Sequence, residues 1–209
     1  MKARTEIERI LKLSPVMPVV VIEDPAVAPD LARALWRGGL RAIEVTLRTP
    51  AALQAIEAIA RDVPEIAVGA GTVLAVDDLH AAVNAGAAFA ISPGTTAALV
   101  EAGAHSAIPY LPAVATASEL MLGLAHGYHC FKFFPAALAG GPPMLKAFAG
   151  PFPQARFCPT GGITPETQRT YLNLPNVLCV GGSWLAPADV VAARDWTRIE
   201  ALAAAAARA

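Results

Sequence analysis

Two charged residues of opposite sign interrupt apolar segments of this 209-residue chain. Lys132 lies within Cys130–Phe134 and Glu44 lies within Arg41–Leu47, and both segments have the composition of β-strands. Side chains alternate between the two faces of a strand, so Lys132 points away from the phenylalanines on either side of it. By the same alternation, Glu44 shares a face with Arg48, which follows its strand directly. The pattern predicts an amine and a carboxylate on the inner face of a sheet.

A lysine amine that is sheltered from water can act as a nucleophile. Burial disfavours the charged ammonium, and the neutral amine of Lys132 can then attack a carbonyl group to form an imine. Glu44 is the only acid within the predicted strands, and it can move protons beside that amine. Arg48 can hold a carboxylate by two parallel hydrogen bonds. The alternatives are a lysine that reaches solvent, a plain buried ion pair and a surface arginine.

Paired glycines follow the last two predicted strands. Gly161 and Gly162 come after Thr160, and Gly182 precedes Ser183 in the run Gly-Gly-Ser. Glycine lets a backbone approach a ligand closely, and the corresponding loops of barrel enzymes often bind phosphate through their amides. Ordinary tight turns are the alternative for each pair. Two such pairs together favour a phosphate site.

Two further turns are predicted near the same end of the strands. Gly69–Val73 follows the third strand and contains Thr72, and Ser92–Gly94 follows the fourth. We expect both to supply backbone donors, with the Thr72 hydroxyl as a further polar group. Each segment has a simple alternative as a structural turn.

Strand-like and helix-like segments alternate along the chain. The strand segments are Pro18–Ile22, Arg41–Leu47, Ile66–Val73, Phe89–Pro93, Ala107–Leu111, Cys130–Phe134, Arg156–Thr160 and Val177–Val180. The helix segments are Ala28–Gly38, Ala51–Arg61, Asp77–Asn84, Thr95–Gly103, Thr116–Gly127, Pro143–Phe148, Thr164–Leu172 and Trp196–Ala207. This alternation, in a chain of about 200 residues, predicts an α/β fold, a closed parallel (β/α)8 TIM barrel. A doubly wound open sheet is the alternative, but it uses fewer strands, and no GxGxxG turn follows the first strand.

No linker, low-complexity segment or strong repeat divides the sequence, so we expect one domain over residues 1–209. An extra amphipathic N-terminal helix is predicted over Met1–Ser14, without the apolar centre of a signal peptide. No apolar run reaches the roughly 18 to 20 residues of a bilayer span. We therefore expect a cytoplasmic protein that does not bind a membrane.

The composition also bears on partners and metals. Sixteen basic residues against 17 acidic ones leave no basic excess for binding nucleic acid. The cysteines lie in apolar segments and form no CxxC pair, which predicts buried free thiols at Cys130, Cys158 and Cys179. The histidines lie away from the carboxyl ends of the strands, which predicts surface or packing roles and no metal site for His80, His105, His126 and His129.

Six motifs resemble, in order, those of the 2-keto-3-deoxy-6-phosphogluconate (KDPG) aldolase family, also called the 4-hydroxy-2-oxoglutarate aldolase family. They are Glu44–Arg48, Val68–Val73, Ala90–Gly94, Phe131–Ala136, Phe157–Ile163 and Gly181–Trp184. The resemblance extends over Pro15–Arg198, nearly the whole chain. It implies a class I aldolase that cleaves the phosphorylated keto acid to pyruvate and glyceraldehyde 3-phosphate. It further implies that the enzyme is a homotrimer and uses neither a metal nor an organic cofactor.

The same resemblance implies roles for individual residues. Lys132 would form the Schiff base with the C2 carbonyl, and Glu44 would relay protons. The residues implied to hold or line the pyruvyl group are Arg48, Thr72, Thr160, Pro93 and Phe134. Those implied to hold the distal phosphate are Gly161, Gly162, Gly182 and Ser183.

Two positions depart from the family pattern. Ala113 stands where the family usually has the glycine of a Pro-Gly turn, and Ala137 stands where it often has an acid. Alanine adopts positive φ less easily than glycine, so we expect a displaced fifth loop. These departures bear on the choice among substrates, of which 4-hydroxy-2-oxoglutarate and a galactonate-derived epimer are the rivals. A rival of another class is a non-catalytic barrel that binds sugar phosphates.

Overall fold

Short parallel strands alternate with helices along residues 2–209, which the computed structural model describes, with side chains given from residue 6 onward. The strands are β1 (Val16–Val20), β2 (Ala42–Thr46), β3 (Ala67–Gly71), β4 (Phe89–Ile91), β5 (Tyr110–Leu111), β6 (Ala113–Val114), β7 (Cys130–Phe133), β8 (Arg156–Pro159) and β9 (Val180–Gly182). The alternation of strand and helix that the sequence predicts is confirmed.

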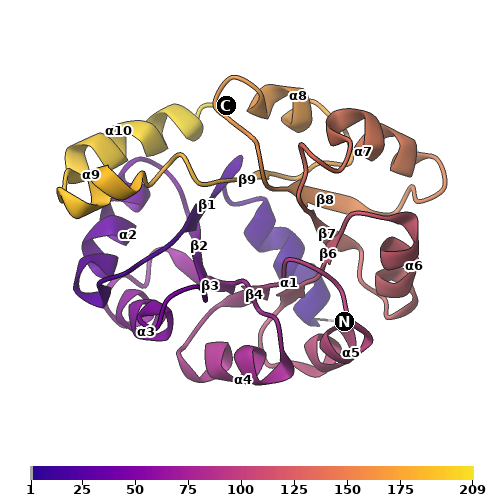
Figure 1. The fold of residues 1–209 in the computed structure, drawn as a ribbon, viewed down its shortest axis with the longest axis horizontal. Coiled ribbons are helices and arrows are strands. Elements are labelled where there is room, and N and C mark those ends of the chain that lie inside the picture. Colours follow the sequence, from indigo (N-terminus) through magenta and orange to yellow (C-terminus); the bar gives the residue numbers. More distant parts are fainter. Residues whose placement is uncertain (1) are drawn as a thin grey trace.

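Helices lie around the outside of the strands (Figure 1). The α-helices are α1 (Lys2–Leu11), α2 (Ala28–Arg37), α3 (Ala52–Asp62), α4 (Val76–Asn84), α5 (Ala97–His105), α6 (Ala117–Ala125), α7 (Gly141–Ala149), α8 (Gln168–Leu172), α9 (Ala188–Ala192) and α10 (Trp196–Ala206), and a 3-10 helix η1 covers Pro25–Val27. Several begin with a side-chain cap, for example α6, where Thr116 and Glu119 form a reciprocal capping box. Within the described residues, no helix has the length and apolar character needed to cross a bilayer.

The strands form two parallel sheets that curl around a common centre. One has the order β5-β4-β3-β2-β1-β9 and the other β6-β7-β8, and Figure 1 shows both inside the ring of helices. A parallel bridge between Thr160 and Gly181 joins the end of β8 to β9. On the other side the two sheets are joined through the chain itself, because only Pro112 separates β5 from β6. Strand β5 pairs with β4 of the first sheet, and β6 pairs with β7 of the second.

The fifth and eighth predicted strands differ from the observed ones. The fifth predicted strand ends at Leu111, whereas the chain continues through Pro112 into β6. Proline lacks an N–H, but the carbonyl of Pro112 still accepts a hydrogen bond from the Lys132 amide, so pairing continues past it. The eighth is predicted over Val177–Val180, whereas β9 begins at Val180 and includes Gly182. Glycines lower strand propensity, so the sequence pattern ended this strand too early.

Aromatic residues of β7 pack outward against the helices. The ring of Phe133 lies edge-on to Phe148 of α7, with centroids 6.2 Å apart, and Phe131 lies 6.3 Å from Phe157 of β8. Both β7 rings are fully buried in the larger hydrophobic cluster, between sheet and helices. Their outward placement leaves Cys130 and Lys132 on the inner face.

Helix α1 covers the amino ends of the strands. Its buried residues Ile7, Ile10 and Leu11 belong to a smaller cluster with side chains at or next to strand starts. Those partners include Met17, Ala42, Phe89 and Cys130. The predicted N-terminal helix is thus present from Lys2, while Met1 lies outside the described residues. With one end of the strands covered, functional groups are expected at the carboxyl end.

Candidate active site

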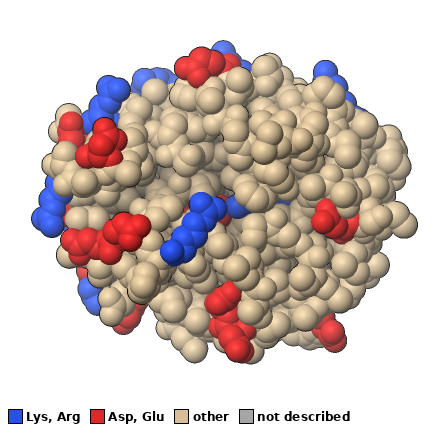
Figure 2. Space-filling model, viewed as in Figure 1, with Lys and Arg blue, Asp and Glu red and all other residues tan. Residues whose placement is uncertain are grey.

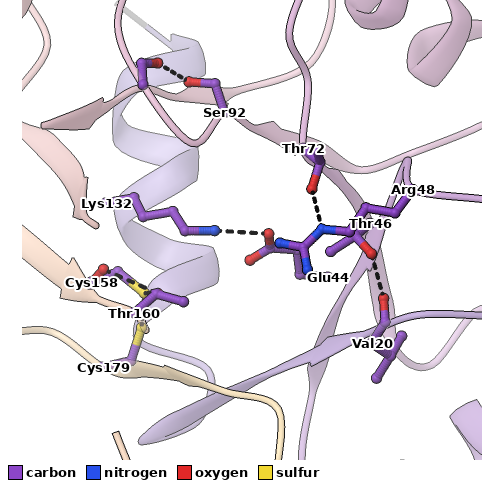
Figure 3. Close-up of polar contacts among 11 residues, drawn as sticks. Val20, Glu44, Thr46, Arg48, Thr72, Ser92, Lys132, Cys158, Thr160 and Cys179 are labelled. Carbon is purple, nitrogen blue, oxygen red and sulfur yellow. Dashed lines mark hydrogen bonds and ion pairs between the residues drawn. The ribbon is translucent and has the colours of Figure 1, made fainter. Parts of the chain in front are cut away.

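Lys132 and Glu44 form a buried ion pair at the centre of the curled sheets. The Nζ atom of Lys132 lies 3.0 Å from Oε1 of Glu44, and Figure 3 shows this contact reaching from β7 across to β2. Lys132 is 5% exposed and Glu44 is 1% exposed. Among the side chains that the structure describes, these are the only buried charged ones. The prediction that both point inward and meet is confirmed.

Glycine at Gly71 makes room for the Glu44 carboxylate. A Cβ added at Gly71 would overlap the carboxyl group of Glu44. Gly71 pairs with Thr46 of β2, and Glu44 lies two residues before Thr46 on that strand. Gly69 similarly leaves room for the ring of Phe89. The turn predicted over Gly69–Val73 is wrong for its first three residues, because both glycines lie inside β3, and only Thr72 and Val73 follow the strand.

Arg48 and Thr72 meet at the carboxyl ends of β2 and β3. The Nε atom of Arg48 donates to Oγ1 of Thr72 at 3.2 Å. No residue within the described chain bonds the two terminal nitrogens of this guanidinium, which suit a bidentate bond to a carboxylate. Thr72 has φ of 59°, a left-handed conformation that non-glycine residues rarely adopt outside functional or turn positions.

Figure 2 shows a hollow near the centre of the face opposite α1, with blue and red atoms inside it. The surrounding surface on this face is mostly uncharged, and its other charged side chains lie toward the edge. The exposed Arg48 and the buried Lys132 and Glu44 make this end of the strands the charged centre of the molecule.

Thr160 lies at the end of β8 above two buried thiols. Its Oγ1 donates to the carbonyl of Cys158 at 3.4 Å and lies 3.9 Å from the Cys158 sulfur, which is 3.5 Å from the Cys179 sulfur. Gly181 is opposite, and a Cβ there would overlap the Thr160 side chain. Gly181 therefore makes space for Thr160 beside the ion pair. All three predicted thiols are free and buried, as the sequence indicates.

Phe134 and Pro93 follow the strands β7 and β4. The Lys132 ammonium lies 5.4 Å from the centre of the Phe134 ring, within cation–π range. Phe134 precedes a cis peptide bond to Pro135. Pro93 is half-buried two residues after the last residue of β4. An apolar ring thus borders the amine.

The predicted phosphate residues divide into two kinds. Gly161 and Gly162 have φ of 100° and 73°, so this loop requires glycine for its backbone conformation. Gly182 lies in β9 with negative φ, and an added Cβ would overlap the ring of Trp184. Gly182 therefore serves packing, and Ser183 next to it is exposed at the end of the strand.

The two departures from the family pattern have definite places. Ala113 begins β6, is buried and is the register partner of Lys132, so this position lies in a strand. Its φ is not positive, since Thr72 and Arg194 are the only non-glycine residues with positive φ in the described part of the chain. Ala137 is exposed and its amide donates to the carbonyl of Gly161 at 3.0 Å. The backbone at Ala113 thus needs no positive φ, and Ala137 borders the glycine loop.

The histidines lie away from the ion pair. His80, His105 and His129 are exposed and His126 is half-buried, as expected for surface or packing residues. Within residues 6–209, the structure contains no group of three or more histidine, cysteine, aspartate or glutamate side chains placed to hold a metal ion.

Two buried hydroxyl residues support the site through contacts that the sequence does not predict. Thr46 is fully buried and its hydroxyl donates to the carbonyl of Val20 at 3.0 Å, which ties β1 to β2 next to Glu44. Ser92 is also fully buried and bonds to Tyr110. Both contacts join segments far apart in the chain, so their only sequence signal is a hydroxyl residue within an apolar strand.

The comparison with known proteins agrees with this geometry. A family model described as KDPG and KHG aldolase matches residues 7–202. The KHG/KDPG aldolase of Escherichia coli (strain K12) is 54% identical over 200 residues, covering 96% of this chain and 94% of that protein.

Solved structures are similar over nearly the whole length. KDPG aldolase from Legionella pneumophila, with pyruvate captured at low pH as a covalent carbinolamine intermediate, has a TM-score of 0.94 and 51% identity and covers 96% of this chain and 97% of that one. The aldolase of Zymomonas mobilis ZM4 with 3-phosphoglycerate has a TM-score of 0.94 and 50% identity, covering 98% and 96%. The resemblance predicted from the six motifs is confirmed: this chain belongs to the KDPG and KHG aldolase family.

Proposed function

We propose that this protein, an aldolase by family, cleaves 2-keto-3-deoxy-6-phosphogluconate to pyruvate and glyceraldehyde 3-phosphate through a Schiff base on Lys132. One observation carries the proposal. A buried lysine nitrogen lies 3.0 Å from a buried carboxylate oxygen at the carboxyl end of parallel strands. Transfer of one proton from Lys132 to Glu44 gives a neutral amine and a carboxylic acid, which imine formation requires.

The reaction begins with the attack of the Lys132 nitrogen on the C2 carbonyl. The resulting carbinolamine loses its hydroxyl as water, with the proton supplied by Glu44, and an iminium ion forms. The carboxylate of Glu44 then removes the proton of the C4 hydroxyl. The electrons of the C3–C4 bond pass into the iminium, so glyceraldehyde 3-phosphate leaves and an enamine remains.

The second half of the reaction returns the enzyme to its starting state. Glu44 gives its proton to C3 of the enamine, which produces the iminium of pyruvate. Water adds to that iminium while Glu44 takes one of its protons. The carbinolamine then collapses, with its hydroxyl proton passing to the departing nitrogen, and releases pyruvate and the free amine of Lys132. Supporting this sequence, the relative from Legionella pneumophila holds pyruvate as a covalent carbinolamine.

The remaining residues bind the two ends of the substrate in this proposal. Arg48, Thr72 and Thr160 hold the carboxylate of the pyruvyl group, since an arginine and two hydroxyls suit that anion. Pro93 and Phe134 line the apolar side of the same pocket. The distal phosphate binds to the loop of Gly161 and Gly162 and to Gly182 and Ser183, where backbone amides can approach it. No metal or organic cofactor takes part.

Borohydride reduction tests the Schiff base. Incubation with pyruvate and borohydride is expected to attach a reduced pyruvyl group permanently at Lys132, which peptide mass spectrometry locates. The exposed Lys146 on α7 should remain unmodified, and Lys132→Met should prevent the mass gain. A wild-type protein that turns over substrate yet stays unmodified would rule out imine catalysis.

A second substrate, 4-hydroxy-2-oxoglutarate, is favoured by one specific observation. The Escherichia coli relative carries both substrates in its name, KHG/KDPG aldolase. The proposal expects a kcat/KM several-fold higher for the phosphorylated substrate, because contacts to a remote phosphate can stabilise the transition state. A galactonate-derived epimer belongs in the same comparison. Binding of these compounds without turnover would instead support a non-catalytic sugar-phosphate-binding barrel.

We also propose the finer features of architecture and setting. Residues 1–209 form one (β/α)8 barrel domain with an extra N-terminal helix, supported by the parallel pairs and by the bridge from Thr160 to Gly181. The enzyme works in the cytoplasm, since a sugar phosphate does not cross a bilayer unaided, and it assembles as a homotrimer. Sedimentation of the purified protein tests the assembly.

A further inference from the structure

Two buried hydroxyl groups lie behind the turn that carries Pro93. Ser92 follows β4, is 0% exposed, and its Oγ donates to the carbonyl of Gly94 at 2.5 Å. Tyr110 of β5 is 2% exposed, and its hydroxyl donates to the same Ser92 Oγ at 2.7 Å. A serine hydroxyl has a single proton, so donation to Gly94 makes Ser92 an acceptor toward Tyr110. The hydrogen bonds therefore run in one direction, from Tyr110 through Ser92 to Gly94.

This hydrogen-bond chain lies on the outer side of the strands, away from the ion pair. Ile91 of β4 belongs to the smaller hydrophobic cluster and Tyr110 to the larger one, between sheet and helices, and the Ser92 hydroxyl bonds to Tyr110, so Ser92 lies on the outer side. Figure 3 shows Ser92 and its hydrogen bond above the Lys132–Glu44 contact in that view. Ser92 and Tyr110 thus hold the turn on both sides of Pro93 from the outer side of the strands.

The residue that follows this turn, Thr95, is bonded to strand β6. Thr95 Oγ1 donates to the carbonyl of Ala113 at 2.5 Å, and Ala113 is the register partner of Lys132. Buried hydrogen bonds in series strengthen one another. Burial also raises the pKa of Tyr110 to about 12, partly opposed by its bond to Ser92, so the hydroxyl keeps its proton at neutral pH.

We propose that Tyr110 is a positioning residue that acts through Ser92 to hold Pro93 against the pyruvyl pocket. Tyr110 and Ser92 do not touch the substrate. Their effect is to fix the Pro93 turn before substrate binds, so that the pocket needs no further ordering. The inference rests on the proposed function, because Pro93 borders a substrate only if pyruvate reacts at Lys132.

Tyr110→Phe tests the inference, with Tyr128→Phe as the matched control. Tyr128 is also buried, lies edge-on to Tyr110 with ring centres 6.0 Å apart, and donates its hydroxyl to a backbone carbonyl, that of Val100, at 2.8 Å. That carbonyl belongs to helix α5 and not to the turn. Each variant therefore deletes one buried tyrosine hydroxyl, but only one deletion reaches Pro93.

The measurements are aldol-cleavage kinetics and the pyruvate dependence of borohydride trapping. For Tyr110→Phe we expect the half-saturating pyruvate concentration and KM to rise about tenfold, since small displacements of a positioning group cost this much or more. The trapping rate at saturating pyruvate should stay within about twofold of wild type, because Lys132 and Glu44 are untouched. Tyr128→Phe should change neither quantity, whatever its melting temperature.

Ser92→Ala removes the middle of the chain and gives a second variant should Tyr110→Phe fold poorly. It is expected to raise KM in the same way, and the double variant should be no worse than the worse single one, because both act on one chain. Equal KM in the two tyrosine variants would overturn the inference, and so would independent, additive effects of Ser92→Ala and Tyr110→Phe. A wild-type protein that borohydride does not trap would contradict the proposed function instead.

Discussion

At the scale of single residues, the molecule depends on a lysine and a glutamate that compensate each other's burial. Removing a charged group from water is costly, and one partner alone would be an uncompensated charge in an apolar interior. The pair is not optimised for stability, since apolar residues of similar volume often serve a core equally well. The Phe134 ring 5.4 Å from the Lys132 nitrogen fits the chemistry proposed at that nitrogen.

Glu44→Gln tests the proton transfers. Glutamine keeps the size of the side chain but cannot exchange a proton, so kcat for cleavage should fall by about 100- to 10,000-fold. Steady-state kinetics with 2-keto-3-deoxy-6-phosphogluconate measures the effect. Glu65→Gln, an exposed glutamate between α3 and β3, is the control and should remain near wild type. A kcat within several-fold of wild type for Glu44→Gln would exclude Glu44 as the proton carrier.

At the scale of elements, strand β3 is shaped by its neighbours. Its glycines face the Glu44 side chain from β2 and the Phe89 ring from β4, and neither space admits a Cβ. A strand of low intrinsic propensity is tolerated here because it is buried and paired on both sides. The strand's composition is thus a consequence of the side chains that it must accommodate.

Gly71→Ala tests this steric account. The added methyl group would displace the Glu44 carboxylate, so we expect activity to fall at least about tenfold and stability to fall by about 1 to 3 kcal/mol. Urea denaturation and cleavage kinetics measure the two effects. Gly150→Ala after α7 is the control, since its Cβ would meet only the carbonyl of Ala147, at 3.8 Å. Wild-type activity in Gly71→Ala would show that Glu44 has room to move.

At the scale of the whole molecule, the two ends of the strands differ in polarity. The amino end is covered by α1 and filled with apolar side chains and thiols, and the carboxyl end holds the ion pair and the glycine loops. Burial at this covered end raises the pKa of the Cys130 thiol to about 12 from a usual 9.0. The apolar cluster under α1 and the Lys132–Glu44 pair therefore lie toward opposite ends of the strands.

The Cys130 thiol makes stability depend on alkaline pH. Its pKa is raised in the folded state, so its contribution is complete below the unfolded value of 9.0 and is lost as pH rises toward about 12. Within that window the free energy of unfolding should fall by about 1.4 kcal/mol per pH unit from this group. Urea denaturation of wild type and Cys130→Ala between those pH values measures the difference in slope. Parallel curves would show that the thiol is not shielded in the folded state.

Some features could be predicted from sequence because they follow from local rules. Strand alternation places Lys132 and Glu44 on the inner face, and the apolar segments around the cysteines predict buried thiols. The order of six short motifs identifies the family. These inferences need only the geometry of a single strand or a linear comparison, and the structure and the relatives confirm them.

Other contacts between distant residues follow only from the tertiary structure. The room that Gly71 leaves for Glu44, the continuation of a strand through Pro112 and the bond from Tyr110 to Ser92 depend on the register between neighbouring strands. Register is set by the packing of the whole sheet, which no short segment encodes. Local sequence patterns thus specify which side chains are reactive and on which face of a strand they lie. The 3.0 Å contact between Lys132 and Glu44 additionally requires that the sheets curl around one centre.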